Sequence, residues 1–286
     1  MYFNIGEDMK IVREVLNITQ EELSKEIDVE PLTIKRIEKG STNASKRTLD
    51  LFYDFVYKKR IYLNKIKEMF YKEGMKGDIL LFHGSKTNII GEIDVSKGRV
   101  NNDFGPGFYC GESYEQSASF IENFKDSSVY FLSFNNKGLK DIKYSVDRDW
   151  MLTIAYFRGT LKKYEDHIII KKLISRLKNV DYVIAPIADN RMFRIIDSFI
   201  NGEITDEQCK HCLAATNLGN QYVLLNNLAT KNINILECCY LSNEERKHYR
   251  NMKDEDNNIS EDKVKMARIK YRGKGLYIDE ILKWKK

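Results

Sequence analysis

The sequence predicts an α+β protein whose N-terminal part is entirely α-helical. Residues 7–59 place their apolar side chains at helical spacing, and no alternating pattern indicates a strand there. After Gly77, short apolar runs such as 78–83 and 129–134 mix irregularly with helical patterns, which favours an α+β domain over repeating βαβ units. We therefore expect an N-terminal helical domain over 1–60, a helical linker over 61–77 and a second domain over 78–286.

The composition supports a folded chain with a substantial core and excludes several classes of protein. Hydrophobic residues make up 42% and charged residues 31%, too apolar a balance for a disordered chain. No apolar run is long enough to cross a membrane, and residues 1–10 lack the apolar core of a signal peptide. We therefore expect a cytoplasmic protein with no membrane partner, whose five cysteines are reduced.

Charge is distributed unevenly along the chain. The net charge of +5 permits contact with nucleic acid without requiring it. Residues 1–60 hold 11 basic and 11 acidic side chains, whereas residues 244–286 hold 13 basic and 9 acidic ones. The basic excess therefore lies near the C-terminus, where we interpret the stretch 263–274 as a solvated face rather than a binding site.

The N-terminal helices have readable boundaries. Thr19 and Glu22 form the pattern of a capping box, so a helix should start after Thr19. Pro31 suits the first turn of the next helix, and Gly40 should end it. Ser45 is placed to cap a further helix, and 60–76 should form one more helix or a helical linker.

Three segments of this helical part form a recognisable pattern, namely 9–13 (MKIVR), 18–24 (ITQEELS) and 33–40 (TIKRIEKG). Together they resemble a Cro/repressor-type (XRE) helix-turn-helix. The resemblance implies that the second helix of the pair enters the major groove of DNA and that two copies could form a homodimer. The predicted nucleic-acid residues are Gln20, Thr33, Lys35 and Arg36.

The charge of this module differs from the usual pattern. Glu30 stands where a serine is more usual, and the module as a whole is neutral. Because phosphate contacts supply much of the affinity for DNA, we expect weak binding by a single copy. Dimerisation or docking of a protein partner is the alternative function of this module.

The second part should contain both strands and helices. We expect strands at 78–83, 129–134, 182–185, 221–225 and 233–236, and helices near 114–124, 149–157, 166–177 and 193–200 and after Thr205. After Leu241 a charged helix should begin, followed by a mobile loop over 253–261. Trp150 should pack in the core, and His167 and His248 should lie at the surface.

Cysteine pairs raise the question of a metal site. Cys209 and Cys212 lie in a helical pattern, whereas Cys238 and Cys239 are adjacent in a strand and must point to opposite faces. We therefore interpret all four as buried free thiols and expect no metal.

Three segments of the second part hold polar residues where packing of a core would not place them, namely 83–85 (HGS) at the end of a strand, 103–109 (DFGPGFY), and 220–222 (NQY) at the start of a strand. Each segment alone is a weak indication of function. In this order, together with 181–190 (DYVIAPIADN) and 200–204 (INGEI), they resemble a bacterial family of uncharacterised proteins with an ADP-ribosyltransferase-like fold. The resemblance covers about 78–237 and implies a split β-sheet. His83, Tyr109 and Gln221 then correspond to the His-Tyr-Glu signature of diphtheria-toxin-type transferases, with Gln221 at the last position.

The resemblance also implies a reaction on NAD as co-substrate. His83, Tyr109 and Gln221 are then the catalytic residues, and the predicted NAD-binding residues are His83, Gly84, Ser85, Asp103, Gly107, Tyr109 and Gln221. Gln221 would orient a ribose hydroxyl but brings no negative charge to the oxocarbenium-like ribose. Asp103 is the nearest candidate acid, followed by Asp189.

The leading hypothesis is an NAD-dependent ADP-ribosyltransferase, acting as a toxin or phage-defence effector on an unknown protein or nucleic-acid acceptor. The alternative is a transcriptional regulator whose second domain senses a nucleotide without catalysis. A third hypothesis is a protein–protein interaction module.

Overall fold

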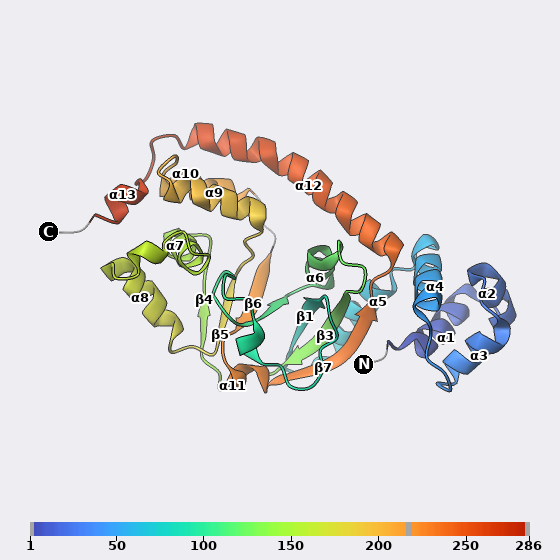
Figure 1. The fold of residues 1–286 in the computed structure, drawn as a ribbon. Coiled ribbons are helices and arrows are strands. Elements are labelled where there is room, and N and C mark those ends of the chain that lie inside the picture. The colour runs from blue at the N-terminus through green and yellow to red at the C-terminus, as the bar shows by residue number, and fades with distance from the viewer. Residues whose placement is uncertain (1–2, 216–218, 284–286) are drawn as a thin grey trace. The chain divides into compact units, whose positions relative to one another are not determined.

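The structure is a computed structural model that describes residues 3–215 and 219–283 (Figure 1). Its contacts divide the chain into two compact units. The first unit comprises residues 1–91, 113–135 and 234–253, and the second comprises 92–112, 136–233 and 254–286. The architecture is the predicted mixture of a helical N-terminal region and α+β structure.

The N-terminal region of the first unit consists of five helices. They are α1 (Ile5–Leu16), α2 (Gln20–Ile27), α3 (Pro31–Glu38), α4 (Lys46–Lys58) and α5 (Leu63–Gly74). The predicted capping box is confirmed, since the Thr19 side chain accepts a hydrogen bond from the Glu22 amide and the Thr19 amide donates to the Glu22 carboxylate at 2.7 Å. Pro31 opens α3 and Ser45 caps α4, also as predicted.

The core of this region is built from one apolar stripe of each helix. Met9, Leu23, Ile34 and Phe52 come from α1 to α4 in turn, and all four are fully buried. Burial of each such side chain stabilises the fold by about 1.5–3 kcal/mol. The amphipathic spacing of the sequence therefore determines how the helices pack.

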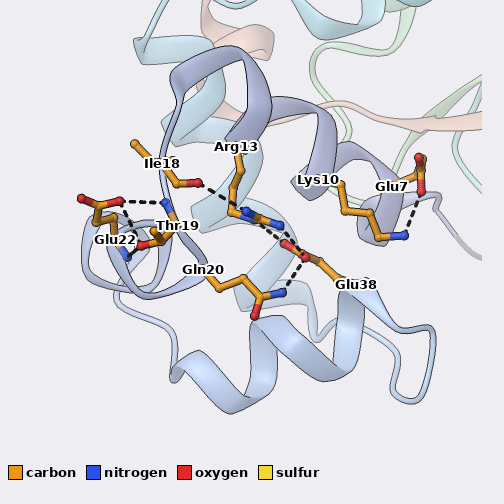
Figure 2. Close-up of polar contacts among 8 residues, drawn as sticks. All are labelled: Glu7, Lys10, Arg13, Ile18, Thr19, Gln20, Glu22 and Glu38. Carbon is orange, nitrogen blue, oxygen red and sulfur yellow. Dashed lines mark hydrogen bonds and ion pairs between the residues drawn. The ribbon is translucent and has the colours of Figure 1, made fainter.

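A buried ion pair joins α1 and α3 (Figure 2). Arg13 of α1 donates from Nε and from a terminal nitrogen to the two oxygens of Glu38 of α3, at 2.7 and 2.9 Å. Arg13 also donates to the carbonyl of Ile18, and Gln20 of α2 donates to Glu38 at 2.7 Å. The Glu38 side chain is only 4% exposed. This cluster ties α1, the following loop, α2 and α3 together.

The titration of Glu38 reflects these bonds. Burial alone would raise the pKa of its carboxyl, but hydrogen bonds from Arg13 and Gln20 outweigh burial and hold the pKa below the ordinary value of 4.5. A carboxylate whose folded-state pKa is lowered stabilises the fold at neutral pH and loses that contribution in acid.

The strands of the first unit are β1 (Ile79–Ser85), β3 (Ser128–Phe134) and β7 (Ile233–Tyr240), in the order β1-β3-β7. β1 and β3 are antiparallel, with Leu81 opposite Leu132. Helix α6 (Tyr114–Ile121) packs on β1, where the Ser117 hydroxyl donates to the carbonyl of Phe82 at 3.0 Å. A Cβ added to Gly84 would lie 2.6 Å from the carbonyl oxygen of Ser117, so this packing requires glycine.

The second unit contains four strands in the order β4-β5-β6-β2 within the described residues. β4 (Asp141–Lys143) is parallel to β5 (Tyr182–Pro186), whereas β6 (Asn220–Leu224) is antiparallel to both β5 and β2 (Phe108–Gly111). The sheet is therefore mixed. β4 was not predicted, because a strand of three residues has too little pattern to be recognised.

Helices of the second unit supply most of its core. They are α7 (Arg148–Phe157), α8 (Ile168–Leu177), α9 (Asn190–Ile200), α10 (Asp206–Ala214), α11 (Asn227–Thr230) and α13 (Ile278–Ile281), with short 3₁₀ turns at Val95–Lys97 and Lys162–Tyr164. Trp150 is fully buried in this core, as predicted. No helix among the described residues has the length and apolar character that a membrane crossing requires.

Two sequence predictions are wrong. The expected mobile loop over 253–261 is instead part of one 28-residue helix, α12 (Asn243–Lys270), visible as a continuous helix in Figure 1. No Gly or Pro interrupts that stretch, and Ser260 is buried and bonded to Arg191 of α9. His167 is 3% exposed rather than at the surface, and its Nδ1 caps α8 by accepting a hydrogen bond from the Ile169 amide. His248 is exposed, as predicted.

We predict that Glu38→Gln lowers the free energy of unfolding by about 3 kcal/mol at pH 7, because Arg13 loses its charged partner. The matched control is Lys10→Ala, which removes the exposed Lys10–Glu7 pair (3.1 Å, Figure 2) and should change stability by less than about 0.5 kcal/mol. Urea unfolding measures both. The advantage of the wild type over Glu38→Gln should vanish as the pH falls below 4.5 and through the lowered pKa. An advantage independent of pH contradicts this assignment.

We also predict that Gly84→Ala destabilises the protein by about 1–3 kcal/mol, because the added methyl meets backbone that cannot retreat without moving α6. A Cβ added to Gly74 at the end of α5 would have nothing within 4 Å, so Gly74→Ala is the control and should be neutral or slightly stabilising. Thermal unfolding compares the two. Equal melting temperatures would show that α6 does not constrain residue 84.

Candidate functional site

One face of α3 is exposed. Four exposed residues lie on this side of the helix because of their spacing of three, one and three residues, namely Leu32, Lys35, Arg36 and Lys39. Leu32 is 56% exposed. Of the predicted nucleic-acid residues, Lys35 and Arg36 belong to this face, and Thr33 is half-buried beside it.

The charge of this face differs from that of the whole module. Glu38 is the acidic residue of α3, but it is buried and its charge is compensated by Arg13. The exposed side of the helix therefore presents three basic residues, and only Glu30 at the N-cap opposes them. A neutral module can thus carry a locally basic helix, the arrangement that contact with phosphates favours.

Gln20 also belongs to the buried cluster. Its amide nitrogen donates to Glu38, so at least part of its hydrogen-bonding capacity serves the fold (Figure 2). A phosphate contact by Gln20 stays a prediction.

In the second unit, Gln221 and Asp103 form a buried pair. Gln221 lies on β6, with Gly111 and Ala185 opposite it on the neighbouring strands. Its Nε2 donates to Oδ2 of Asp103 at 2.8 Å and to the carbonyl of Pro186 at 3.2 Å. Gln221 is 7% and Asp103 5% exposed. Two of the predicted NAD-binding residues are therefore in direct contact.

Asp103 is paired at its other oxygen with Arg158. Nε of Arg158 donates to Oδ1 of Asp103 at 2.8 Å, and a terminal nitrogen lies 2.6 Å from the same oxygen. Arg158 also donates to the carbonyl of Ala188 at 2.6 Å, and its guanidinium lies 4.5 Å from the ring centre of Phe193. The charge of Asp103 is thus compensated rather than available to a ligand.

Tyr109 lies on the same sheet face as Gln221. It is directly opposite Val223, two residues along β6 from Gln221, and residues two apart on a strand share a face. The Tyr109 hydroxyl accepts a hydrogen bond from the Phe104 amide at 3.0 Å and donates to the Gly105 carbonyl at 2.7 Å. Burial raises the pKa of this hydroxyl well above its ordinary value, so it stays protonated.

The loop between Asp103 and Tyr109 depends on two glycines. Gly105 has φ +77°, a conformation that favours glycine. A Cβ on Gly107 would lie 3.0 Å from the Leu224 carbonyl oxygen of β6. Gly107 therefore packs this loop against the strand that carries Gln221.

The remaining predicted residues lie on β1 of the first unit. His83 is opposite Tyr130 in the β1–β3 register and is partly buried. Ser85 ends the strand, and its hydroxyl donates to the Thr87 carbonyl at 2.7 Å. Gly84 has the packing role against α6 described above. The assignment of these three residues to NAD stays a prediction.

Sequence reasoning missed the residues that complete both clusters. Arg158 follows the last residue of α7, where a basic side chain is common because it complements the helix dipole, so nothing distinguished it. Glu38 gave a readable indication, since it lies four residues after Ile34 on the apolar stripe of α3, where a lone carboxylate needs a partner.

The cysteines are free and buried, as predicted. Within the described residues, no group of three or more His, Cys, Asp or Glu side chains is placed to hold a metal ion. Burial raises the pKa of the thiols of Cys110, Cys209 and Cys239, which keeps them protonated and poorly reactive.

Two family models match parts of the chain. Residues 9–52 match the family model described as helix-turn-helix, in agreement with the geometry of α2 and α3. Residues 79–235 match the family described as protein of unknown function (DUF3990). No curated protein and no solved structure matches the chain. The match to the second family spans more than half of the 286 residues, and the chain therefore belongs to the DUF3990 family and carries an N-terminal helix-turn-helix.

Proposed function

We propose that this protein binds DNA through α3 and that its DUF3990 domain is an NAD-dependent ADP-ribosyltransferase. The observation that carries the enzymatic part is the fixed orientation of Gln221, whose amide nitrogen is bonded to Asp103 and Pro186. The sequence resemblance to ADP-ribosyltransferase-like proteins supplies the reaction class. A transferase of this kind that modifies a cellular macromolecule would serve as a toxin or a phage-defence effector.

Transfer of ADP-ribose from NAD requires few protein side chains. The bond between nicotinamide and C1′ of the ribose breaks, nicotinamide leaves with the bonding electrons, and the acceptor forms a new bond to C1′ while losing a proton. A hydrogen-bond acceptor near the 2′-hydroxyl holds the ribose while positive charge develops. Gln221 offers such an acceptor, and Tyr109 offers an aromatic ring on the same sheet face.

One observation favours the alternative, a regulator that senses a nucleotide without catalysis. Gln221 is uncharged, and Arg158 compensates the adjacent Asp103. A sensor needs only the hydrogen bonds of this site, whereas an enzyme gains from a negative charge beside the oxocarbenium. Release of free nicotinamide from NAD by the purified protein decides between the two, since the sensor binds NAD but leaves it intact.

We predict that Gln221→Ala lowers the rate of nicotinamide release by about tenfold or more while NAD affinity changes less, because the lost acceptor acts mainly as charge develops. The control is Tyr222→Phe, on the next residue of β6 and the opposite sheet face, where the ring stacks on Tyr182. That variant should keep the wild-type rate. Equal rates for Gln221→Ala and the wild type would remove Gln221 from the reaction.

For DNA, we predict that Arg36→Ala weakens specific binding by about 1–3 kcal/mol, the range for a base-edge contact. Lys58→Ala is the matched control, an exposed basic residue on α4 paired with Glu244. It should leave the affinity within about 0.5 kcal/mol of wild type. Fluorescence anisotropy on selected duplexes measures both, and an equal effect of the two substitutions would argue against docking through α3.

A further inference from the structure

The partners of Gln221 determine how its amide is turned. Both partners of Nε2, the Asp103 carboxylate and the Pro186 carbonyl, can only accept hydrogen bonds. The nitrogen must therefore face them, and the carbonyl oxygen Oε1 must face away. Chemistry fixes this assignment, which for an isolated glutamine would be ambiguous.

Within the described residues, the Gln221 oxygen Oε1 has no hydrogen-bond donor. It is also not among the fully buried unpaired polar atoms of the described residues, so solvent reaches it although Gln221 is only 7% exposed. An acceptor that is held in place, unpaired and reachable suits a hydroxyl group of a ligand.

Arg158 prevents Asp103 from exchanging its two oxygens. Both contacts of Arg158 are made with Oδ1, and Oδ2 alone faces Gln221. Arg158 is itself held by the Ala188 carbonyl and lies over the Phe193 ring. Each carboxylate oxygen therefore has one fixed role.

We propose that Asp103, anchored by Arg158, is the positioning residue that holds the carbonyl oxygen of Gln221 toward a ribose hydroxyl, so that the site requires glutamine, and not glutamate, at position 221. The predicted effect on the rate of nicotinamide release rests on the proposed function. The orientation of the Gln221 amide follows from its contacts with Asp103 and Pro186 alone.

Two single substitutions disrupt the cluster in opposite ways. In Asp103→Asn, Arg158 keeps the new amide oxygen, so the new amide nitrogen faces Nε2 of Gln221, donor against donor. Gln221 then turns over and presents nitrogen to the ligand. In Gln221→Glu, a carboxylate oxygen replaces Nε2 only 2.8 Å from Oδ2 of Asp103, and like charges at that distance resist ionisation.

The double variant restores the cluster with its polarity reversed. The asparagine nitrogen at 103 donates to the glutamate at 221, and Arg158 keeps its oxygen partner. The number of charges in the cluster is the same as in the wild type, one positive and one negative. An oxygen again faces the ligand.

The test measures melting temperature and the kcat and KM of nicotinamide release for the wild type, Asp103→Asn, Gln221→Glu and the double variant. Asp103→Asn should lower kcat about tenfold or more with a smaller change in KM. The difference in melting temperature between the wild type and Gln221→Glu should be about 3 °C or more larger at pH 8 than at pH 5. The reason is that the pKa of the new carboxyl is raised in the folded state, and the stability of a group with a raised pKa is lost as the pH rises. The double variant should recover both losses.

A matched control separates this role from a general like-charge effect. Asn226 donates to Asp181 at 2.9 Å, so Asn226→Asp creates the same carboxylate contact elsewhere in the second unit. It should show a pH-dependent loss of melting temperature with unchanged kcat.

The outcomes distinguish the two proposals. If the wild type releases nicotinamide but Asp103→Asn does so equally well, or the double variant recovers nothing, the positioning role is overturned. If the wild type neither binds NAD nor releases nicotinamide, the proposed function fails, and the melting temperatures decide the inference. Recovery of the melting temperature in the double variant then supports the pairing of residues 103 and 221. Additive losses of melting temperature overturn it.

Discussion

The bonds of Asp103 hold together a buried polar cluster of the second unit. A buried carboxylate is stable only when its charge and its lone pairs are matched, and Arg158 and Gln221 meet these needs at separate oxygens. Because Arg158 compensates the charge of Asp103, the cluster carries no net negative charge. The orientation of the Gln221 amide is therefore coupled to residue 103.

The helix-turn-helix also contains a buried carboxylate whose charge is matched by a partner, but there the pair connects helices. Glu38 is buried on the apolar stripe of α3 and is matched by Arg13 and Gln20. The pair fixes the helices to one another and also removes an acidic charge from the surface. The net charge of the module, which is zero, consequently says little about the basic face formed by Lys35, Arg36 and Lys39.

Buried polar groups also explain where sequence reasoning failed. The pattern of an amphipathic helix predicts that His167 lies at the surface, yet its ring caps α8 and is buried. The acidic stretch 253–261 reads as a loop, yet it continues α12, with Ser260 bonded to Arg191. In both cases the polar side chain has a hydrogen-bond partner that the polarity of the segment does not indicate, namely the Ile169 amide for His167 and Arg191 for Ser260.

The sequence by itself determined the helical N-terminal module, its caps at Thr19, Pro31 and Ser45, and most strands and helices of the DUF3990 domain, because spacing and capping are local properties. It also singled out Asp103, Tyr109 and Gln221. Only the tertiary structure decided that Asp103 turns Gln221, that Arg158 neutralises Asp103, and that Glu38 is hidden behind Arg13. These pairings join residues 25 to 118 positions apart, and no local pattern encodes which distant partner satisfies a buried charge.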